Sequence, residues 1–152
     1  DDDDDDDDDD ERPPGFDLFS ADERDPNDEF CLRLGGDGDG DDDTAGTTIT
    51  LRGVRARNPH LLRSTGLTLW KGSEGLCEYL RANPRLVNGK DVVELGAGLG
   101  LCGIAAHRLG ARNVVLTDGD TDALATMRRN IDANRDPSGG GGEICARQLL
   151  WG

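Results

Sequence analysis

Hydrophobic residues recur with two different periods after residue 46. In four segments, apolar residues alternate with polar ones or form short runs rich in valine and leucine, a pattern typical of β-strands. These segments are residues 47–54, 91–95, 113–117 and 143–150. In three other segments, apolar residues stand three or four positions apart, as they do on one face of a helix. These segments are residues 71–84, 100–110 and 120–135.

The order of these segments predicts the fold class. From residue 91 the chain reads strand, helix, strand, helix, strand with short connections, which is the first half of a doubly wound α/β sheet of the Rossmann type. The runs 91–95 and 113–117 are compact enough to be buried parallel strands. We expect a small β/helix extension to precede this unit.

Within the predicted helices, particular residues are expected to share a buried face. In residues 71–84 these are Leu76, Cys77 and Leu80. In residues 120–135 they are Leu124, Met127 and Ile131, with Arg128 and Arg129 turned to solvent.

Charge divides the chain at residue 46. Residues 1–46 hold 22 of the 32 acidic residues and 3 of the 17 basic ones, whereas residues 47–152 are slightly basic. We therefore predict an acidic, largely disordered tail or linker over 1–46 and a single domain over 47–152. The apolar islands 16–19 and 30–34 are candidate edge strands within the tail.

A calcium loop starting at Asp37 is the alternative interpretation of the aspartate-rich run. Its sixth position is Asp42, where the turn requires glycine, and its twelfth is Thr48, where a bidentate glutamate belongs. A solvated linker fits this run better.

The cysteines and the chain ends bear on the compartment. Cys31, Cys77, Cys102 and Cys145 form no CxxC pair, and no signal peptide or Asn-x-Ser/Thr acceptor is present. We expect reduced, mostly buried thiols in a cytoplasmic or nuclear protein, with no metal and no membrane partner. The chain starts at Asp1 and its one methionine is Met127, so we also expect a fragment of a longer protein.

A glycine-rich turn follows the strand that ends at Leu95. It reads Glu94-x-Gly96-x-Gly98-x-Gly100, and Asp118 stands at the end of the next predicted strand. A literal GxGxxG spans residues 98–103, but the dinucleotide fingerprint places its first glycine where the strand ends. Counted from there, Leu101 stands where the third fingerprint glycine belongs, so the dinucleotide interpretation is displaced by two residues.

Each part of this pattern suits a nucleoside ligand. Gly96 and Gly98 allow close approach and positive φ, and the helix that follows offers N–H groups to a carboxylate. Asp118 is placed to accept hydrogen bonds from both ribose hydroxyls. S-adenosylmethionine supplies a ribose, a carboxylate and positive charge that Glu94 favours, whereas a pyrophosphate gains nothing from Glu94. The competing interpretation is an ordinary β–α turn in which Asp118 caps the next helix.

Four segments together resemble the methyltransferase 16 group of seven-β-strand, S-adenosylmethionine-dependent methyltransferases. They are residues 64–70, 92–101, 116–118 and 149–152. The resemblance covers residues 47–152 and implies S-adenosylmethionine as cofactor and a protein lysine as substrate.

The resemblance also implies roles for residues of the turn and beyond it. Trp70 would lie near the cofactor, Gly96, Ala97 and Gly98 would wrap its methionine part, Asp118 would hold the ribose, and Trp151 would border the adenine. Leu150 departs from the group, whose members often carry an acid there, which weakens the expectation for contacts on the adenine side.

The group's D-x-x-Y/F signature does not occur before Gly152, so the catalytic residues stay unknown. Of a sheet in the order 3-2-1-4-5-7-6, we expect strands 3, 2 and 1, with strand 1 at an exposed edge. Two alternatives stay open. One is a domain fused to an RNA methyltransferase of the tRNA 3-methylcytidine type, and the other is a cofactor-binding remnant without catalysis.

Overall fold

The computed structural model describes residues 28–34, 47–55, 64–136 and 141–152. The candidate strand at 16–19, the aspartate-rich runs and residues 37–46 of the rejected calcium loop lie outside these residues. The elements in order are β1 (Asp28–Leu34), β2 (Thr47–Gly53), the 3-10 turn η3 (Thr65–Leu67), α1 (Lys71–Ala82), the 3-10 turn η4 (Pro84–Leu86), β3 (Asp91–Leu95), α2 (Leu101–Arg108), β4 (Asn113–Asp118), α3 (Thr121–Ala133) and β5 (Glu143–Gln148).

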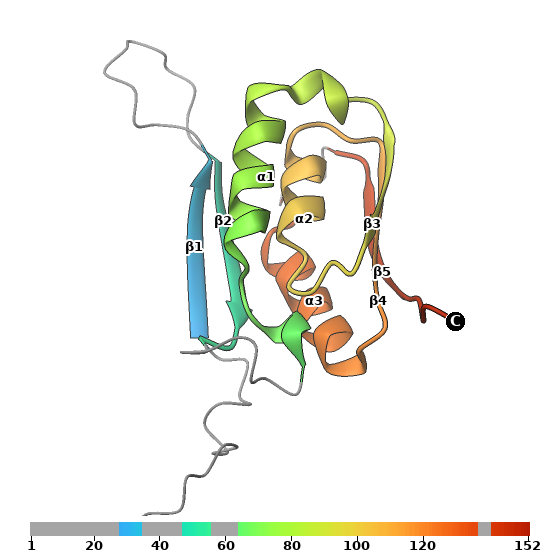
Figure 1. Cartoon of the computed structure of the whole chain (residues 1–152). Coiled ribbons are helices and arrows are strands. Elements are labelled where there is room, and N and C mark those ends of the chain that lie inside the picture. The colour runs from blue at the N-terminus through green and yellow to red at the C-terminus, as the bar shows by residue number, and fades with distance from the viewer. Residues whose placement is uncertain (1–27, 35–46, 56–63, 137–140) are drawn as a thin grey trace, which may run out of the picture.

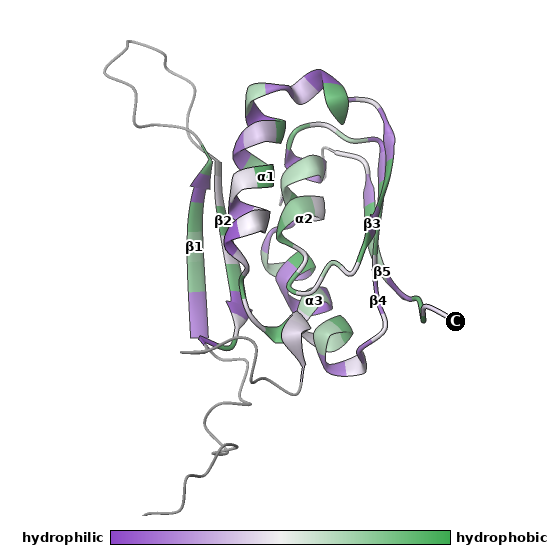
Figure 2. Cartoon of the chain, in the orientation of Figure 1, coloured by the Kyte–Doolittle hydropathy of each residue, from purple (hydrophilic) through white to green (hydrophobic). Residues whose placement is uncertain are grey.

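These elements form three layers (Figure 1). The β1–β2 hairpin lies on one side, the three α-helices occupy the middle, and β3, β4 and β5 form a sheet on the other side. Helix α2 is covered from both sides, which explains why six of its eight residues are buried and why it carries mostly hydrophobic colours in Figure 2. The core therefore lies on both faces of the helix layer.

The three-stranded sheet is parallel, with strands in the order β3-β4-β5. This confirms the predicted strand–helix–strand–helix–strand unit as an α/β arrangement. The aligned residues Val92, Val114 and Ile144 face the helix layer and are partly or fully buried.

The opposite face of β3 corrects one expectation. Residues 91–95 read as a buried strand, yet Val93 and Leu95 are 65% and 61% exposed. The helix layer covers one face of the sheet, and side chains alternate between the faces of a strand. Every second residue of β3 therefore points away from the helices.

The β1–β2 hairpin confirms two predicted strands. The strands pair antiparallel from Asp28 opposite Gly53 to Leu34 opposite Thr47, and Leu34, Ile49 and Leu51 are buried against the helices. Strand β1 lies inside the segment that we assigned to the acidic tail, in which residues 30–34 were a candidate edge strand. The division of the chain at residue 46 stays a prediction.

Helix α1 differs from the prediction at one residue. Cys77 is buried, but Leu76 is 46% exposed, because neighbouring residues point about 100° apart on a helix. Among the cysteines, Cys77 and Cys102 are buried, Cys145 is partly buried and Cys31 is exposed, so the expectation of mostly buried thiols holds for the helices only. In the described part of the chain, no helix has the length and apolar character that crossing a membrane requires.

Candidate cofactor site

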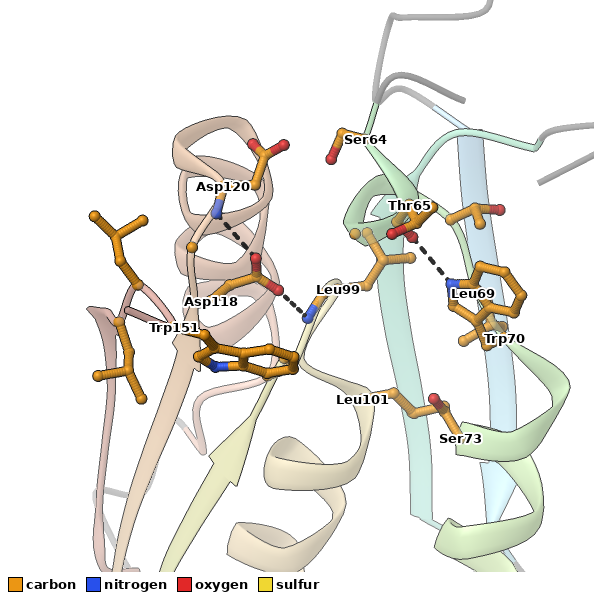
Figure 3. Close-up of a pocket in the computed structure, with 18 residues that line it drawn as sticks. Ser64, Thr65, Leu69, Trp70, Ser73, Leu99, Leu101, Asp118, Asp120 and Trp151 are labelled. Carbon is orange, nitrogen blue, oxygen red and sulfur yellow. Dashed lines mark hydrogen bonds between the residues drawn. The ribbon is translucent and has the colours of Figure 1, made fainter. Parts of the chain in front are cut away.

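A cavity of about 520 Å³ opens where β3 and β4 end and where α2 and α3 begin. The segment from Ser64 to the first turn of α1 forms its other wall, as Figure 3 shows. The residues that line it are 64–66, 68–70, 73, 96–99, 101, 118–120 and 149–151. A cavity of this size at the carboxyl edge of a parallel sheet suits a small-molecule ligand.

The glycine turn forms the floor of this cavity. Gly96, Gly98 and Gly100 have φ values of +63°, +53° and +86°. Residues that carry a Cβ rarely adopt such positive φ values. At Gly98 space adds a second requirement, since a Cβ there would stand 3.0 Å from the carbonyl oxygen of Gly66. The predicted Gly96, Ala97 and Gly98 all line the cavity.

Asp118 lies beside this turn, as the spacing predicted. Its Oδ2 accepts a hydrogen bond from the N–H of Gly98 at 3.0 Å, and its Oδ1 accepts one from the N–H of Asp120 at 3.0 Å (Figure 3). A carboxylate has about four lone-pair positions, so two remain for a ligand after these bonds. Asp118 therefore both fixes the turn and offers acceptors to the cavity.

The two tryptophans lie on opposite walls of the cavity (Figure 3). Trp70 precedes α1, and its indole N–H donates to the carbonyl oxygen of Thr65 at 2.9 Å. The ring of Trp151 lies over Gly96, where a Cβ would be 3.6 Å from the indole. Trp151 is nevertheless 76% exposed, so one of its faces is open to solvent.

Glu94 is placed differently from the other predicted residues. It does not line the cavity, and its Oε2 accepts a hydrogen bond from the N–H of Gly103 in α2 at 2.8 Å. Burial raises the pKa of Glu94 from its ordinary 4.5 to about 7, although the bond from Gly103 and the thiol of Cys102 act in the opposite direction. In this structure Glu94 connects the end of β3 to the first turn of α2.

Gly100 also stands behind the cavity wall. A Cβ on Gly100 would be 3.0 Å from Cγ of Met127 and 3.2 Å from Cδ1 of Leu116. The neighbouring Gly103 is tighter still, since a Cβ there would be 1.8 Å from Cδ2 of Leu116. Both glycines therefore let α2 pack closely on β4.

Five polar residues that line the cavity were not among the predicted site residues: Ser64, Thr65, Thr68, Ser73 and Asp120. Asp120 caps α3, with its Oδ1 accepting from the N–H groups of Asp122 and Ala123. An acidic residue directly before a helical pattern is a recognisable capping signal. The Ser64 hydroxyl is buried and interacts with the carboxylate of Asp120, whose pKa it helps to lower; Ser64 lies in the segment 64–70 that carries the resemblance, but it was given no role of its own.

The charge of the lining restricts the class of ligand. Asp118 and Asp120 are acidic, and none of the lining residues, all of which belong to the described part of the chain, is a lysine or an arginine. A pyrophosphate at this edge would meet two carboxylates and no cation. A nucleoside with hydroxyl donors and positive charge fits this lining.

The part of the chain that forms the cavity is similar in sequence to known proteins. The sequence profile of a family described as "Lysine methyltransferase" matches residues 54–152, which include the whole cavity lining. A methyltransferase family of this kind uses a cofactor of the S-adenosylmethionine type.

Three relatives illustrate the match. Calmodulin-lysine N-methyltransferase of Arabidopsis thaliana is 34% identical over 96 residues, which are 62% of this chain and 31% of the relative. Methyltransferase-like protein 22 of Mus musculus is 37% identical over 59% of this chain and 23% of its own length. Protein N-terminal and lysine N-methyltransferase EFM7 of Yarrowia lipolytica is 39% identical over 57% of this chain and 30% of its own length.

The matched part of this chain thus spans about a quarter to a third of these relatives. The family profile, in contrast, matches well over half of the 152 residues and covers the glycine turn, Asp118 and both tryptophans. The chain belongs to the lysine methyltransferase family.

Proposed function

We propose that the cavity binds S-adenosylmethionine and that the chain provides the cofactor-binding part of a protein-lysine methyltransferase. The observation that carries this proposal is the lining, which combines a glycine turn with Asp118 and Asp120 and contains no cationic side chain among the described residues. This combination supports a positively charged nucleoside and opposes a dinucleotide, whose pyrophosphate requires donors or cations.

In this proposal, different residues contact different parts of the cofactor. Asp118 accepts from the ribose hydroxyls with its two remaining lone-pair positions. Gly96, Ala97 and Gly98 surround the methionine part on the side of Trp70, and Trp151 borders the adenine. Glu94 and Gly100 act indirectly, by holding α2 against the turn.

The first turn of α2 differs from the expectation at one N–H group. We expected the first turn of α2 to offer its N–H groups to the cofactor carboxylate. The N–H of Gly103 is instead taken by Glu94, so this donor is not available to a ligand.

We further propose that β5, β4 and β3 are strands 3, 2 and 1 of a seven-stranded sheet. The support is the parallel order β3-β4-β5 with β3 at an edge, together with the bare face of β3 at Val93 and Leu95. Parallel strands are normally covered on both faces. Further strands beside β3 and helices on the bare face would complete such a sheet.

The proposed substrate is a lysine side chain of a protein. Two of the relatives described above are named as lysine methyltransferases, one of them for calmodulin. S-adenosylmethionine supplies an activated methyl group, and the chain's contribution is to bind and orient it, which is the main requirement of an in-line transfer. We assign no catalytic base to this chain.

The comparisons with relatives bear differently on the two alternative functions, a fusion to an RNA methyltransferase and a cofactor-binding remnant. A fusion to a tRNA methyltransferase is not favoured, because the printed names of these relatives point to protein substrates or leave the substrate open. A cofactor-binding remnant without catalysis shares the same cavity, so cofactor binding does not separate it from an enzyme. Transfer of labelled methyl groups to protein would separate them.

Substitution of Asp118 tests the proposal. We expect Asp118→Ala to weaken S-adenosylmethionine binding by about 1.5–3 kcal/mol, the usual contribution of a charged hydrogen-bonding group, measured by calorimetric titration of the 152-residue chain. Asp122→Asn is the matched control, because Asp122 is an exposed acid in the first turn of α3 that does not line the cavity. Equal affinity of Asp118→Ala and the unchanged chain would contradict the assignment of Asp118.

A further inference from the structure

Asn130 of α3 and Asn134, which follows α3 as its C-cap, cover the free edge of strand β2. One edge of β2 pairs with β1, and the other faces Asn130 and Asn134. Oδ1 of Asn130 accepts a hydrogen bond from the N–H of Arg52 at 2.7 Å, and Nδ2 of Asn130 donates to the carbonyl oxygen of Arg52 at 3.0 Å. Asn134 does the same with Thr50, at 3.1 and 2.7 Å.

The spacing of helix and strand makes this arrangement possible. Residues four apart on a helix are separated by about 6 Å along its axis, and residues two apart on a strand by about 6.8 Å. The amide groups of Asn130 and Asn134 therefore take the place of a third strand. Without them the backbone groups of a buried edge would be left unpaired, which costs free energy.

Asn130 makes one contact that Asn134 does not make. Its Nδ2 also donates to the carbonyl oxygen of Leu99, in the glycine turn, at 3.0 Å, whereas Nδ2 of Asn134 donates to the carbonyl oxygen of Asn130 itself at 2.7 Å. Asn130 is 1% exposed, so both N–H groups of its amide are used inside the core.

The hairpin and the cavity also meet directly. A Cβ on Gly53 would be 2.7 Å from Cδ1 of Leu99, and the N–H of Val54 donates to the carbonyl oxygen of Leu67 at 2.7 Å. Leu99 is buried and lines the cavity. The backbone of the turn at Leu99 is thus held between α3 and the end of β2.

We propose that Asn130 is a positioning residue for the cofactor turn, a role that rests on the proposed function. Its amide joins three parts that are distant in sequence: α3, strand β2 and the turn that would enclose the methionine part of S-adenosylmethionine. Fixing the Leu99 carbonyl sets the position of Gly98 and Gly100 on either side of it. The hairpin is in this way part of the cofactor site, although it contributes no residue to the lining.

A purely structural role makes a different prediction. If the asparagines serve only to attach the hairpin, their removal should have equal effects, because each makes the same pair of bonds to β2. If Asn130 positions the turn, its removal should in addition loosen residues 96–100 and weaken cofactor binding. The two roles are separated by comparing Asn130 with Asn134.

The experiment uses the 152-residue chain with Asn130→Asp and Asn134→Asp, which keep the side-chain shape but replace the donating NH₂ by an acceptor. Asn130→Ala and Asn134→Ala, which add no buried charge, are the second pair in case the aspartate variants do not fold. Amide hydrogen exchange of residues 96–101, the melting temperature and the dissociation constant for S-adenosylmethionine are measured for each variant.

We expect substitution at either position to lower the melting temperature. At position 130 alone, exchange in the turn should rise, and binding should weaken about fivefold or more, as for the loss of one hydrogen bond. Equal effects at the two positions, or unchanged exchange of the turn in the variants of Asn130, would overturn the proposal. If the unchanged chain does not bind S-adenosylmethionine, the proposed function fails, while the exchange comparison still decides whether Asn130 holds the turn.

Discussion

At the scale of single residues, Gly103 and Gly75 both stand in helices, but a methyl group at the two positions would have opposite effects. At Gly103 it would overlap Cδ2 of Leu116, at 1.8 Å. At Gly75 in α1, nothing lies within 4 Å of the added carbon. Helix α2 packs directly against β4 at Gly103, whereas α1 exposes Gly75 to solvent.

We therefore expect Gly103→Ala to lower the free energy of unfolding by about 1–3 kcal/mol through overpacking. Gly75→Ala should raise it by about 0.4–1 kcal/mol, because alanine loses less chain entropy on folding. Urea unfolding followed by circular dichroism measures both. A stabilised Gly103→Ala variant would show that α2 does not lie as close to β4 as described.

Glu94 gives the protein a specific dependence on pH. Its pKa in the folded chain, about 7, lies above its ordinary 4.5 because the carboxylate is buried. Between these values the folded state binds the proton more readily than the unfolded state. The contribution of Glu94 to stability therefore rises as the pH falls from above 7 towards 4.5, and burial of the charged form is unfavourable above pH 7.

Glu94→Gln should remove this dependence. Glutamine keeps an oxygen acceptor for the N–H of Gly103 and carries no charge, so we expect a gain of about 1–3 kcal/mol at pH 8 and little change near pH 5. Unfolding titrations of both chains at several pH values measure the difference. A loss of stability at pH 8 would indicate that the charge of Glu94 is compensated in the folded protein.

At the scale of elements, the periodicity of apolar residues predicted each strand and α-helix that the structure describes after residue 46, because each has a face that must be buried. It did not predict which faces stay bare. Residues 91–95 read as a buried strand, and the exposure of Val93 and Leu95 follows from the absence of a layer on that side of β3 among the described residues. The pairing of Asn130 with Arg52 could not be predicted from the periodicity, because 78 residues separate the two. Asparagine also ordinarily indicates an exposed position.

The bare edge strand β3 leads to a prediction about association. Val93 is 65% exposed on a strand that, within the described part of the chain, has a neighbour on one side only, and such edges pair with other chains. We expect Val93→Lys to slow the concentration-dependent aggregation of the chain, measured by light scattering. Ala133→Lys, at the exposed C-terminal end of α3, adds the same charge elsewhere and should have little effect. Equal effects of the two substitutions would assign the change to net charge and not to the edge.

At the scale of the whole molecule, most of the residues predicted for the cofactor site line the cavity, but they are a minority of its lining. Six of the eight predicted residues line it: Trp70, Gly96, Ala97, Gly98, Asp118 and Trp151. They were found because turn glycines and strand-end acids have fixed spacings in α/β proteins, and because the two tryptophans match the family. Glu94 and Gly100 act one layer behind, and Ser64 reaches the cavity through the packing of η3 on the turn, which no local pattern records.

The lining of this cavity should select S-adenosylmethionine over a dinucleotide. Calorimetric titration of the 152-residue chain with S-adenosylmethionine and, separately, with NADH measures this selectivity. We expect saturable binding of S-adenosylmethionine at one site and no measurable heat with NADH, because Asp118 and Asp120 would face the pyrophosphate without a cation. Saturable binding of NADH together with no binding of S-adenosylmethionine would contradict this expectation.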